Sequence, residues 1–402
     1  MKKKLTIDKQ ENLLNKSIEQ HLDFSELLNN QELSYDDLSY TQDDYIPKEC
    51  LEKIECLDDI PKAQNNIPAV SFFSGAGGLD IGFSYAGIQT KISIEFNETF
   101  CNTLRKNDPS KIVIGPPNYS GDISKREELA KILAENGISE NFEGVFHGGP
   151  PCQSFSIAAN QRFNKEGENF KRKGFDDEEK GMLIFDYIWF IKKFKPKAFL
   201  IENVEGILEC DSTGKIKKAL DDLKKLGYKI AGPRIFDASY YGVPQKRKRF
   251  IVIGSRTEDA VVLPEPAKKQ TPCGPVFMRD LKSTTSHITR EHTAESIKRY
   301  MLLSYGQRDK LGRVDRLDPR EPSKTVIAGG TKGGGRSHLH PFHPRTLSVR
   351  ECARLQTFPD SYEFTGANAR QFTQVGNAVP PLLAYAIAKE IMEELIDEGS
   401  RL

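Results

Sequence analysis

Between residues 68 and 256, short apolar runs alternate with longer stretches in which apolar residues recur at helical spacing. Strands that alternate with helices of about 10–15 residues indicate βαβ units and a mostly parallel sheet. We therefore predict a doubly wound α/β domain. The predicted strands are Ala69–Phe73, Lys91–Phe96, Glu143–Gly149, Ala198–Val204 and Phe250–Gly254. The predicted helices are Glu98–Lys106, Lys125–Glu135, Met182–Lys193 and Ile216–Leu226.

The chain on either side of this region has a different composition and a different pattern of apolar residues. Residues 1–66 carry acidic pairs and short helical patterns such as Glu11–Leu28, and we interpret them as an acidic accessory extension that is partly flexible. After Arg256 the sequence is rich in Pro, Gly and His, which predicts a separate loop-rich domain, and Leu382–Ile396 returns to a helical period. The expected divisions are the extension 1–66, the α/β domain 67–260, a small domain 261–372 and a C-terminal segment 373–402 that returns to the α/β domain.

The formal net charge of +1 conceals an uneven distribution of charge. The first 66 residues have a net charge of −7, whereas residues 268–345 hold 16 Lys and Arg against 7 acidic residues. A cationic segment of this density suits a polyanionic partner, and an ordinary solvated surface is the alternative interpretation.

The seven cysteines are scattered and form no C-x-x-C pair, which argues against a disulfide framework and against a structural zinc site. No secretory hydrophobic region follows the first four residues, and no apolar stretch approaches the roughly 20 residues of a membrane span. We expect reduced thiols, a cytoplasmic location and no membrane association.

The segment Phe72–Phe83, FFSGAGGLDIGF, contains a glycine-dense turn between the first predicted strand and the start of a helix. Such a turn lets a ligand approach the backbone, and the helix N-terminus offers unpaired N–H groups. The dinucleotide pattern G-x-G-x-x-G fails here, because Asp80 stands where the third glycine is needed. The turn suits a nucleoside-like cofactor without a pyrophosphate, and a plain tight βα turn is the alternative.

Two acidic residues follow the next strands along the chain. Glu95 closes the second strand, where a carboxylate can accept both hydroxyls of a ribose. Asp122 comes after the expected place of the third strand, where a carboxylate can accept a hydrogen bond from an adenine amino group. Either residue can instead cap a helix, and Asp122 precedes a helical run.

The stretch GGPPCQSFS places Cys152 directly after Pro150 and Pro151. Both prolines fix their own φ and donate no backbone hydrogen bond, so regular structure has to stop there. A cysteine kept for packing needs no such setting. The stiffness of this stretch indicates that it positions an exposed thiol.

Further motifs along the chain match those of a known protein family. Glu202 lies in IENVEG, and Gln245, Arg247 and Arg249 lie in QKRKRF. RTLSVRECARLQTFPDSY and QVGNAVPPLLAYAIA follow towards the C-terminus. With the glycine turn and PPCQ, these blocks stand in the order found in the cytosine-C5 DNA methyltransferases, which the chain resembles from about residue 68 to 396, and bacterial restriction–modification enzymes in particular.

The resemblance implies a Rossmann-like S-adenosylmethionine-dependent methyltransferase fold with a smaller target-recognition domain. The implied activity is methyl transfer to C5 of a cytosine flipped out of duplex DNA, with Cys152 adding to C6. Glu202 would bond the N3 and N4 edge of the base, and Arg247 its O2 edge. Arg247 or Arg249 would favour the thiolate, and Gln245 belongs to the same motif. For Glu202 the alternative is a strand-end salt bridge with an arginine.

The implied methyl donor is S-adenosylmethionine, and no metal is expected. The residues that match its site in the family are Phe73, Gly75, Gly77, Glu95, Asp122, Pro150, Asn377 and Val379. His338, His340 and His343 suggest a metal, but the absence of nearby Cys and carboxylates favours phosphate contact or loop packing.

On the DNA side, residues 157–180 resemble the mobile loop that closes over the flipped base, and residues 261–344 the recognition region with its Thr325-Val326 element. The implied partners are double-stranded DNA and a cognate restriction endonuclease acting on the same site, and we expect a monomer. A tRNA cytosine methyltransferase of the same fold and a catalytically silent DNA-binding protein are the rival interpretations.

Overall fold

The computed structural model describes residues 5–42, 44–151, 183–211, 214–281, 284–328 and 338–401. The chain divides into two compact units. We call Asp59–Tyr241, Arg247–Pro266 and Ala378–Leu402 the sheet unit, and Met1–Asp58, Gly242–Lys246 and Ala267–Asn377 the loop-rich unit. This division departs from the expected one, because the N-terminal residues belong to the loop-rich unit and the last crossing into the sheet unit follows Asn377.

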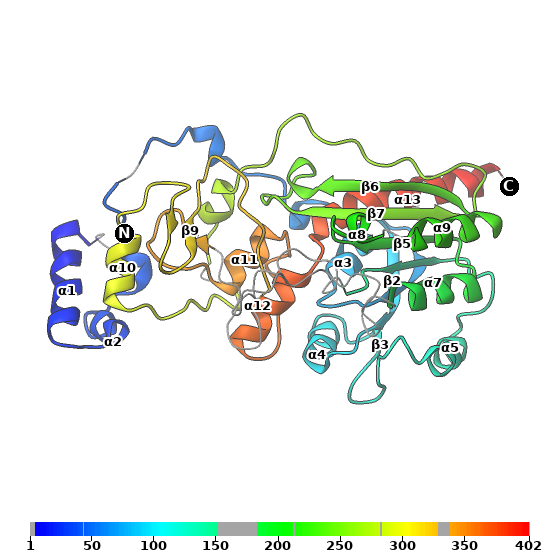
Figure 1. Cartoon of the computed structure of the whole chain (residues 1–402), viewed down its shortest axis with the longest axis horizontal. Helices are drawn as coiled ribbons and strands as arrows, with labels where there is room; N and C mark the ends of the chain where they lie inside the picture. The colour runs from blue at the N-terminus through cyan, green and yellow to red at the C-terminus, as the bar shows by residue number, and fades with distance from the viewer. Residues whose placement is uncertain are drawn as a thin grey trace. The chain divides into compact units, whose positions relative to one another are not determined.

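The sheet unit contains a seven-stranded sheet in the order β3-β2-β1-β4-β5-β7-β6 (Figure 1). Its strands are β1 Ile67–Phe72, β2 Ile88–Ile94, β3 Ile112–Ile114, β4 Val145–Gly148, β5 Ala198–Asn203, β6 Lys229–Asp237 and β7 Lys248–Ser255. The strands from β3 to β5 are parallel, whereas β7 is antiparallel to both β5 and β6. The predicted α/β class with a mostly parallel sheet is therefore confirmed, and two strands are additions to the predicted set: the parallel β3 and the antiparallel β6.

Helices cover both faces of this sheet. On one face, apolar residues of α5, α7 and α9 share a core with Val70, Phe72 and Ile94 of the strands. Elsewhere in the unit α3 packs on α13, and the contact is close because Gly78 and Gly82 leave no room for a Cβ beside the backbone of residues 379–385. The helices are α3 Gly78–Tyr85, α4 Glu98–Asn107, α5 Arg126–Glu135, α7 Leu183–Phe194, α8 Ile207–Cys210, α9 Lys215–Lys225 and α13 Pro381–Arg401.

The loop-rich unit has short elements joined by long connections. A three-stranded sheet in the order β10-β9-β8 is its only sheet among the described residues. The elements are α1 Ile7–Glu19, α2 Phe24–Asn29, α10 Ala294–Tyr300, β8 Arg308–Asp309, β9 Val314–Arg316, β10 His338–Leu339, α11 Val349–Leu355 and α12 Asn368–Asn377. Short 3-10 turns lie at Tyr35–Asp37, Lys48–Cys50, Leu57–Asp59 and Gly274–Met278, and another at Ala238–Tyr240 in the sheet unit. Of the helices in the described ranges, none is both long and apolar enough to cross a membrane.

The N-terminal segment is part of the core of the loop-rich unit, which corrects the expectation of an accessory, partly flexible extension. Leu14, Phe24, Leu28 and Tyr35 are buried together with apolar residues of α10, β9 and β10. The predicted helix Glu11–Leu28 is two helices, because Asp23 accepts a hydrogen bond from the Glu26 amide (2.9 Å) and begins α2.

Candidate active site

The glycine turn bends the backbone sharply between β1 and α3. Phe73, Gly75 and Gly77 all have left-handed backbone conformations, with φ of 54°, 55° and 75°. Gly77 is the residue before α3, and the Phe73 side chain packs partly buried against the core of the sheet unit. A left-handed conformation costs glycine little, which explains why two of these positions are glycine.

The carboxylate of Glu95 is bonded to this turn. One oxygen accepts from the Gly75 amide (2.8 Å) and the other from the Asn97 amide (2.7 Å). Burial raises the pKa of Glu95, and these backbone hydrogen bonds partly offset the increase. A carboxylate can accept about four hydrogen bonds, so Glu95 retains acceptor capacity beside the turn.

Asp122 follows a glycine that packs on Glu95. Gly121 has a φ of 65°, and a Cβ there would collide with the Glu95 carbonyl, so the backbone brings position 122 close to position 95. The Asp122 carboxylate accepts from the Ser124 amide (3.0 Å) and the Ser124 hydroxyl (2.7 Å). It therefore closes a local turn, while α5 begins farther on at Arg126.

The Gly-Pro-Pro step lies at the carboxyl end of β4, next to Glu202 on β5. A Cβ on Gly149 would lie 2.5 Å from Oε2 of Glu202. The Asn203 side-chain amide donates to the Pro150 carbonyl (3.3 Å), which ties the step to β5. Cys152 and the predicted loop 157–180 lie outside the described residues, so Pro151 is the last residue placed before the thiol.

Glu202 is 7% exposed and forms an ion pair with Arg249, whose Nε lies 2.7 Å from Oε1. The strand-end salt bridge weighed from the sequence is therefore present. Burial raises the pKa of Glu202, although Arg249 and Arg247 act in the opposite direction. Arg247 is 2% exposed, and its carbonyl accepts from the Ala238 amide (2.9 Å). The buried carboxyl and its two cations form one charged cluster in the sheet unit.

Gln245 belongs to the other unit and its amide is occupied there. Its Nε2 donates to the Leu355 carbonyl (3.3 Å) and to Oε1 of Gln356 (3.0 Å), while its Oε1 accepts from the Val326 amide (2.8 Å). The side chain is fully buried. Gln245 thus bonds to Val326 in the loop-rich unit, whereas Arg247 and Arg249 of the same motif belong to the sheet unit.

The two predicted residues near the C-terminus lie in different units. Asn377 is the last residue of α12 and is exposed. Val379 is buried in the sheet unit, and its carbonyl packs on Gly78 just after the glycine turn. The sequence order of these residues alone gives no sign of this separation.

A buried polar network behind the glycine turn escaped the sequence-based assignment. The Asp80 carboxylate accepts from the hydroxyls of Ser71 (2.7 Å) and Ser93 (2.7 Å) and pairs with Lys111 (3.0 Å). It thereby joins α3 to β1 and β2. The signal was present, because Asp80 is the residue that breaks the dinucleotide pattern.

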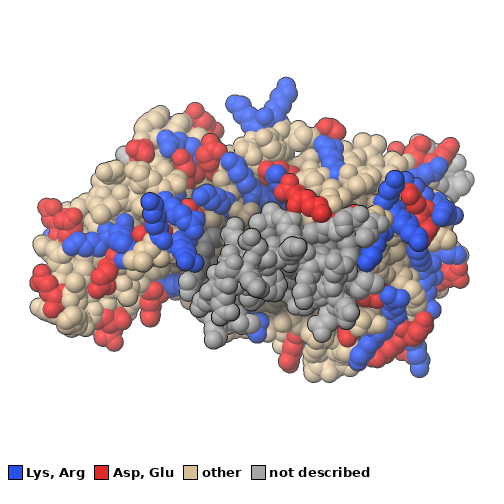
Figure 2. All heavy atoms as spheres, viewed as in Figure 1, with Lys and Arg blue, Asp and Glu red and all other residues tan. Residues whose placement is uncertain are grey.

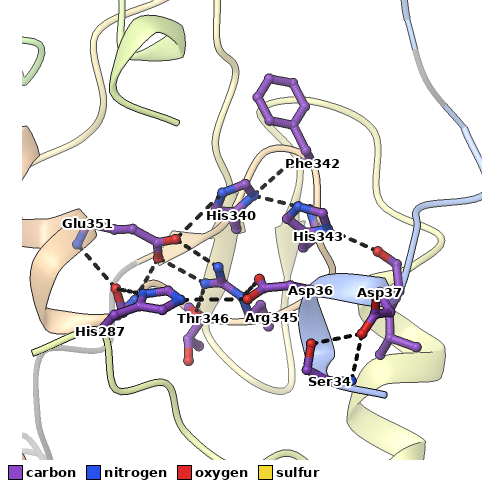
Figure 3. Close-up of polar contacts among 12 residues, drawn as sticks. Ser34, Asp36, Asp37, His287, His340, Phe342, His343, Arg345, Thr346 and Glu351 are labelled. Carbon is purple, nitrogen blue, oxygen red and sulfur yellow. Dashed lines mark hydrogen bonds and ion pairs between the residues drawn. The ribbon is translucent and has the colours of Figure 1, made fainter. Parts of the chain in front are cut away.

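The three histidines are hydrogen-bonded within the loop-rich unit (Figure 3 shows His340 and His343). His338 Nε2 lies 3.1 Å from the Lys324 carbonyl, His340 Nδ1 accepts from the Phe342 and His343 amides, and His343 Nδ1 lies 3.1 Å from the Leu38 carbonyl. Within the described ranges, no group of three or more His, Cys, Asp or Glu could hold a metal ion. These contacts are loop packing.

A model of the C-5 cytosine-specific DNA methylase family matches residues 67–393. The chain belongs to the C-5 cytosine-specific DNA methylases. The methylase is 33% identical over 368 residues to Type II methyltransferase M.PspPI of Psychrobacter sp. (strain TA137), covering 85% of this chain and 82% of the relative. It is 31% identical over 370 residues to Type II methyltransferase M.Eco47II of Escherichia coli, covering 84% and 82%.

Solved structures agree with this assignment. An E. coli prophage-encoded protein described as a DNA modification methyltransferase is similar with a TM-score of 0.65 and 25% identity, over 82% of this chain and all of the other. DNMT2 of Spodoptera frugiperda shares the fold, with a TM-score of 0.54 and 15% identity over 82% of this chain and 100% of the other. The predicted family, fold class and enzyme class are confirmed: the methylase is a DNA (cytosine-5-)-methyltransferase.

Proposed function

We propose that this methylase transfers a methyl group from S-adenosylmethionine to C5 of a cytosine flipped out of a specific duplex DNA sequence. We further propose that it protects DNA against a cognate restriction endonuclease, as the names of its Type II relatives suggest. The observation that carries the proposal is the junction of β4 and β5, where the Gly-Pro-Pro step that precedes Cys152 lies against Glu202 and its arginines.

Cys152 is the proposed nucleophile. Its thiolate forms a bond to C6 of the cytosine, and the electron pair of the C5–C6 double bond becomes available at C5. S-adenosylmethionine, when bound, would supply an electrophilic methyl group to that carbon, and the electron pair of the broken methyl–sulfur bond would stay on its own sulfur. Loss of the C5 proton to a solvent base then returns an electron pair to the ring, so that the S–C6 bond breaks and the thiolate is regenerated.

Glu202 and Arg247 are the proposed binders of the flipped base. The burial that raises the pKa of Glu202 favours the protonated carboxyl, which can donate a hydrogen bond to N3 as charge develops on the ring. Arg247 would bond O2, while Arg249 holds the Glu202 carboxyl in place through its 2.7 Å contact. Gln245 is proposed as a positioning residue for Val326.

The residues around the glycine turn fit S-adenosylmethionine. The remaining acceptor capacity of Glu95 suits the ribose hydroxyls, and the left-handed backbone at Gly75 and Gly77 gives a ligand close access to amide groups. Phe73 and Asp122 would contact the adenine, and the other family-matched positions are Pro150, Asn377 and Val379. We also propose a monomer.

The decisive test replaces the nucleophile. Cys152→Ser should abolish transfer of a labelled methyl group to duplex DNA, and Cys50→Ser, at a half-buried free thiol, is the matched control that should retain it. DNA carrying 5-fluorocytosine should form a covalent adduct with the unaltered chain in the presence of S-adenosylmethionine. Undiminished transfer by Cys152→Ser, or preference for tRNA over duplex DNA in a side-by-side assay, would refute the proposal.

A further inference from the structure

Among the described residues, three arginines of the loop-rich unit are fully buried, and two of them are Arg316 on β9 and Arg345 after β10, each 1% exposed. An arginine always carries its charge, so burying one without partners for its donors is very costly. Both arginines obtain partners from the N-terminal segment 34–42, which lies outside the part of the chain that the family model matches.

Arg345 is bonded on two sides (Figure 3). Glu351 accepts from both terminal nitrogens (2.9 and 2.7 Å), and Asp36 accepts from Nε (2.6 Å). His287 Nε2 lies 3.6 Å from the second Asp36 oxygen. Without Asp36, the Nε donor would be buried with no acceptor from the N-terminal segment.

Arg316 is enclosed by the same segment. Its guanidinium carbon lies 3.5 Å from the centre of the Tyr40 ring and 4.0 Å from that of Tyr305, so it is stacked between two aromatic faces. One terminal nitrogen donates to the Gln42 carbonyl (3.0 Å) and to the Leu303 carbonyl (2.6 Å). The N-terminal segment therefore contributes both a stacking face and an acceptor.

These contacts continue toward the Thr325-Val326 element, which the resemblance places in the target-recognition region. The Tyr40 hydroxyl donates to the His340 carbonyl (2.7 Å), immediately after β10. The Nε2 atom of His338 on β10 in turn lies 3.1 Å from the Lys324 carbonyl oxygen and 3.4 Å from that of Thr325. Thr325 is exposed, whereas Val326 is buried and held by Gln245.

We propose that Asp36 and Tyr40 are positioning residues for target recognition: they fix β9 and β10 through the buried arginines and His340, and thereby set the place of the exposed side chains around Thr325. This inference depends on the proposed function, because it takes the loop-rich unit as the part that reads DNA. It gives the N-terminal segment a role in specificity rather than in the chemical step.

The test compares Asp36→Asn and Tyr40→Phe with the control Asp8→Asn. Asp8 is exposed in the first turn of α1, and its replacement by Asn changes the charge by the same amount as Asp36→Asn. A hydrogen bond to a charged group changes an equilibrium constant by about a factor of ten or more. We therefore expect Asp36→Asn to raise the KM for duplex DNA about tenfold. The kcat and the KM for S-adenosylmethionine should stay within about twofold. Asp36→Glu should restore much of the affinity, and bisulfite sequencing should show methylation at additional sites in Asp36→Asn.

Tyr40→Phe keeps the ring over Arg316 and removes the hydroxyl that bonds to His340, so it provides the test if Asp36→Asn fails to fold. An unchanged KM for DNA and unchanged site choice in folded variants would overturn the inference while leaving the proposed function intact. A fall in kcat without a change in KM would overturn it as well. If the unaltered chain methylates no DNA, the proposed function fails and this inference fails with it.

Discussion

At the scale of single residues, the position of one missing side chain is as important as the side chains that are present. Gly149 has no Cβ, and Oε2 of Glu202 uses the space that this leaves. A Cβ built on Gly149 would lie only 2.5 Å from that oxygen. The glycine does not have a left-handed conformation, so its backbone would accept alanine. The requirement for glycine therefore comes from the neighbouring carboxylate.

Gly149→Ala should leave the fold intact and impair catalysis. The atom that must move is the end of a flexible side chain, so we expect the midpoint of thermal unfolding to change by no more than about 4 °C, equivalent to roughly 1 kcal/mol or less. Under the proposed mechanism the displaced carboxyl would no longer reach the base, and kcat should fall by about 100-fold, within the range of a lost acid–base group. Calorimetry and methyl-transfer kinetics on the same preparation would check this, and a normal kcat would contradict it.

At the scale of elements, the sequence predicted strands where apolar runs are continuous and failed where tertiary contact decides. β5 is buried along its whole length and was found directly. β6 was missed, because Gly232 and Pro233 interrupt it and its burial is partial. For the site, the motif residues Glu202 and Arg249 were identified from sequence, but the fit of Gly149 and Asn203 to them depends on strand register, which no local pattern reveals.

The contact between α3 and α13 gives a prediction at this scale. Alanine normally stabilises a helix interior by about 1 kcal/mol relative to glycine. In Gly82→Ala, however, the new Cβ would meet Ala384 Cβ and the Tyr385 amide at 2.5 Å, and backbone cannot move aside cheaply. We expect a net loss of about 1–3 kcal/mol in the free energy of unfolding. Denaturant titration would measure it, and a more stable variant would show that α13 does not pack as described.

At the scale of the whole molecule, buried charge is distributed over both units, and the net charge of residues 268–345 overstates the cations available to DNA. Arg316 and Arg345 are internal, and Arg279, Arg308 and Arg320 pair with acidic residues. Figure 2 shows Lys and Arg side chains interspersed with Asp and Glu over the face drawn. Lys310 and Arg313 are among the cations of this region that are exposed.

Both units should lose stability together as the pH falls. Burial lowers the pKa of His147 in the sheet unit and of His292 and His338 in the loop-rich unit to about 4, against an ordinary value of 6.5. Between these values the unfolded chain binds protons that the folded chain does not, so each histidine removes up to about 1.4 kcal/mol per pH unit. Thermal unfolding followed from pH 7 to pH 4 should therefore show a falling midpoint. His338→Gln should weaken that dependence if it folds, and a midpoint that rises on acidification would contradict the burial of these imidazoles.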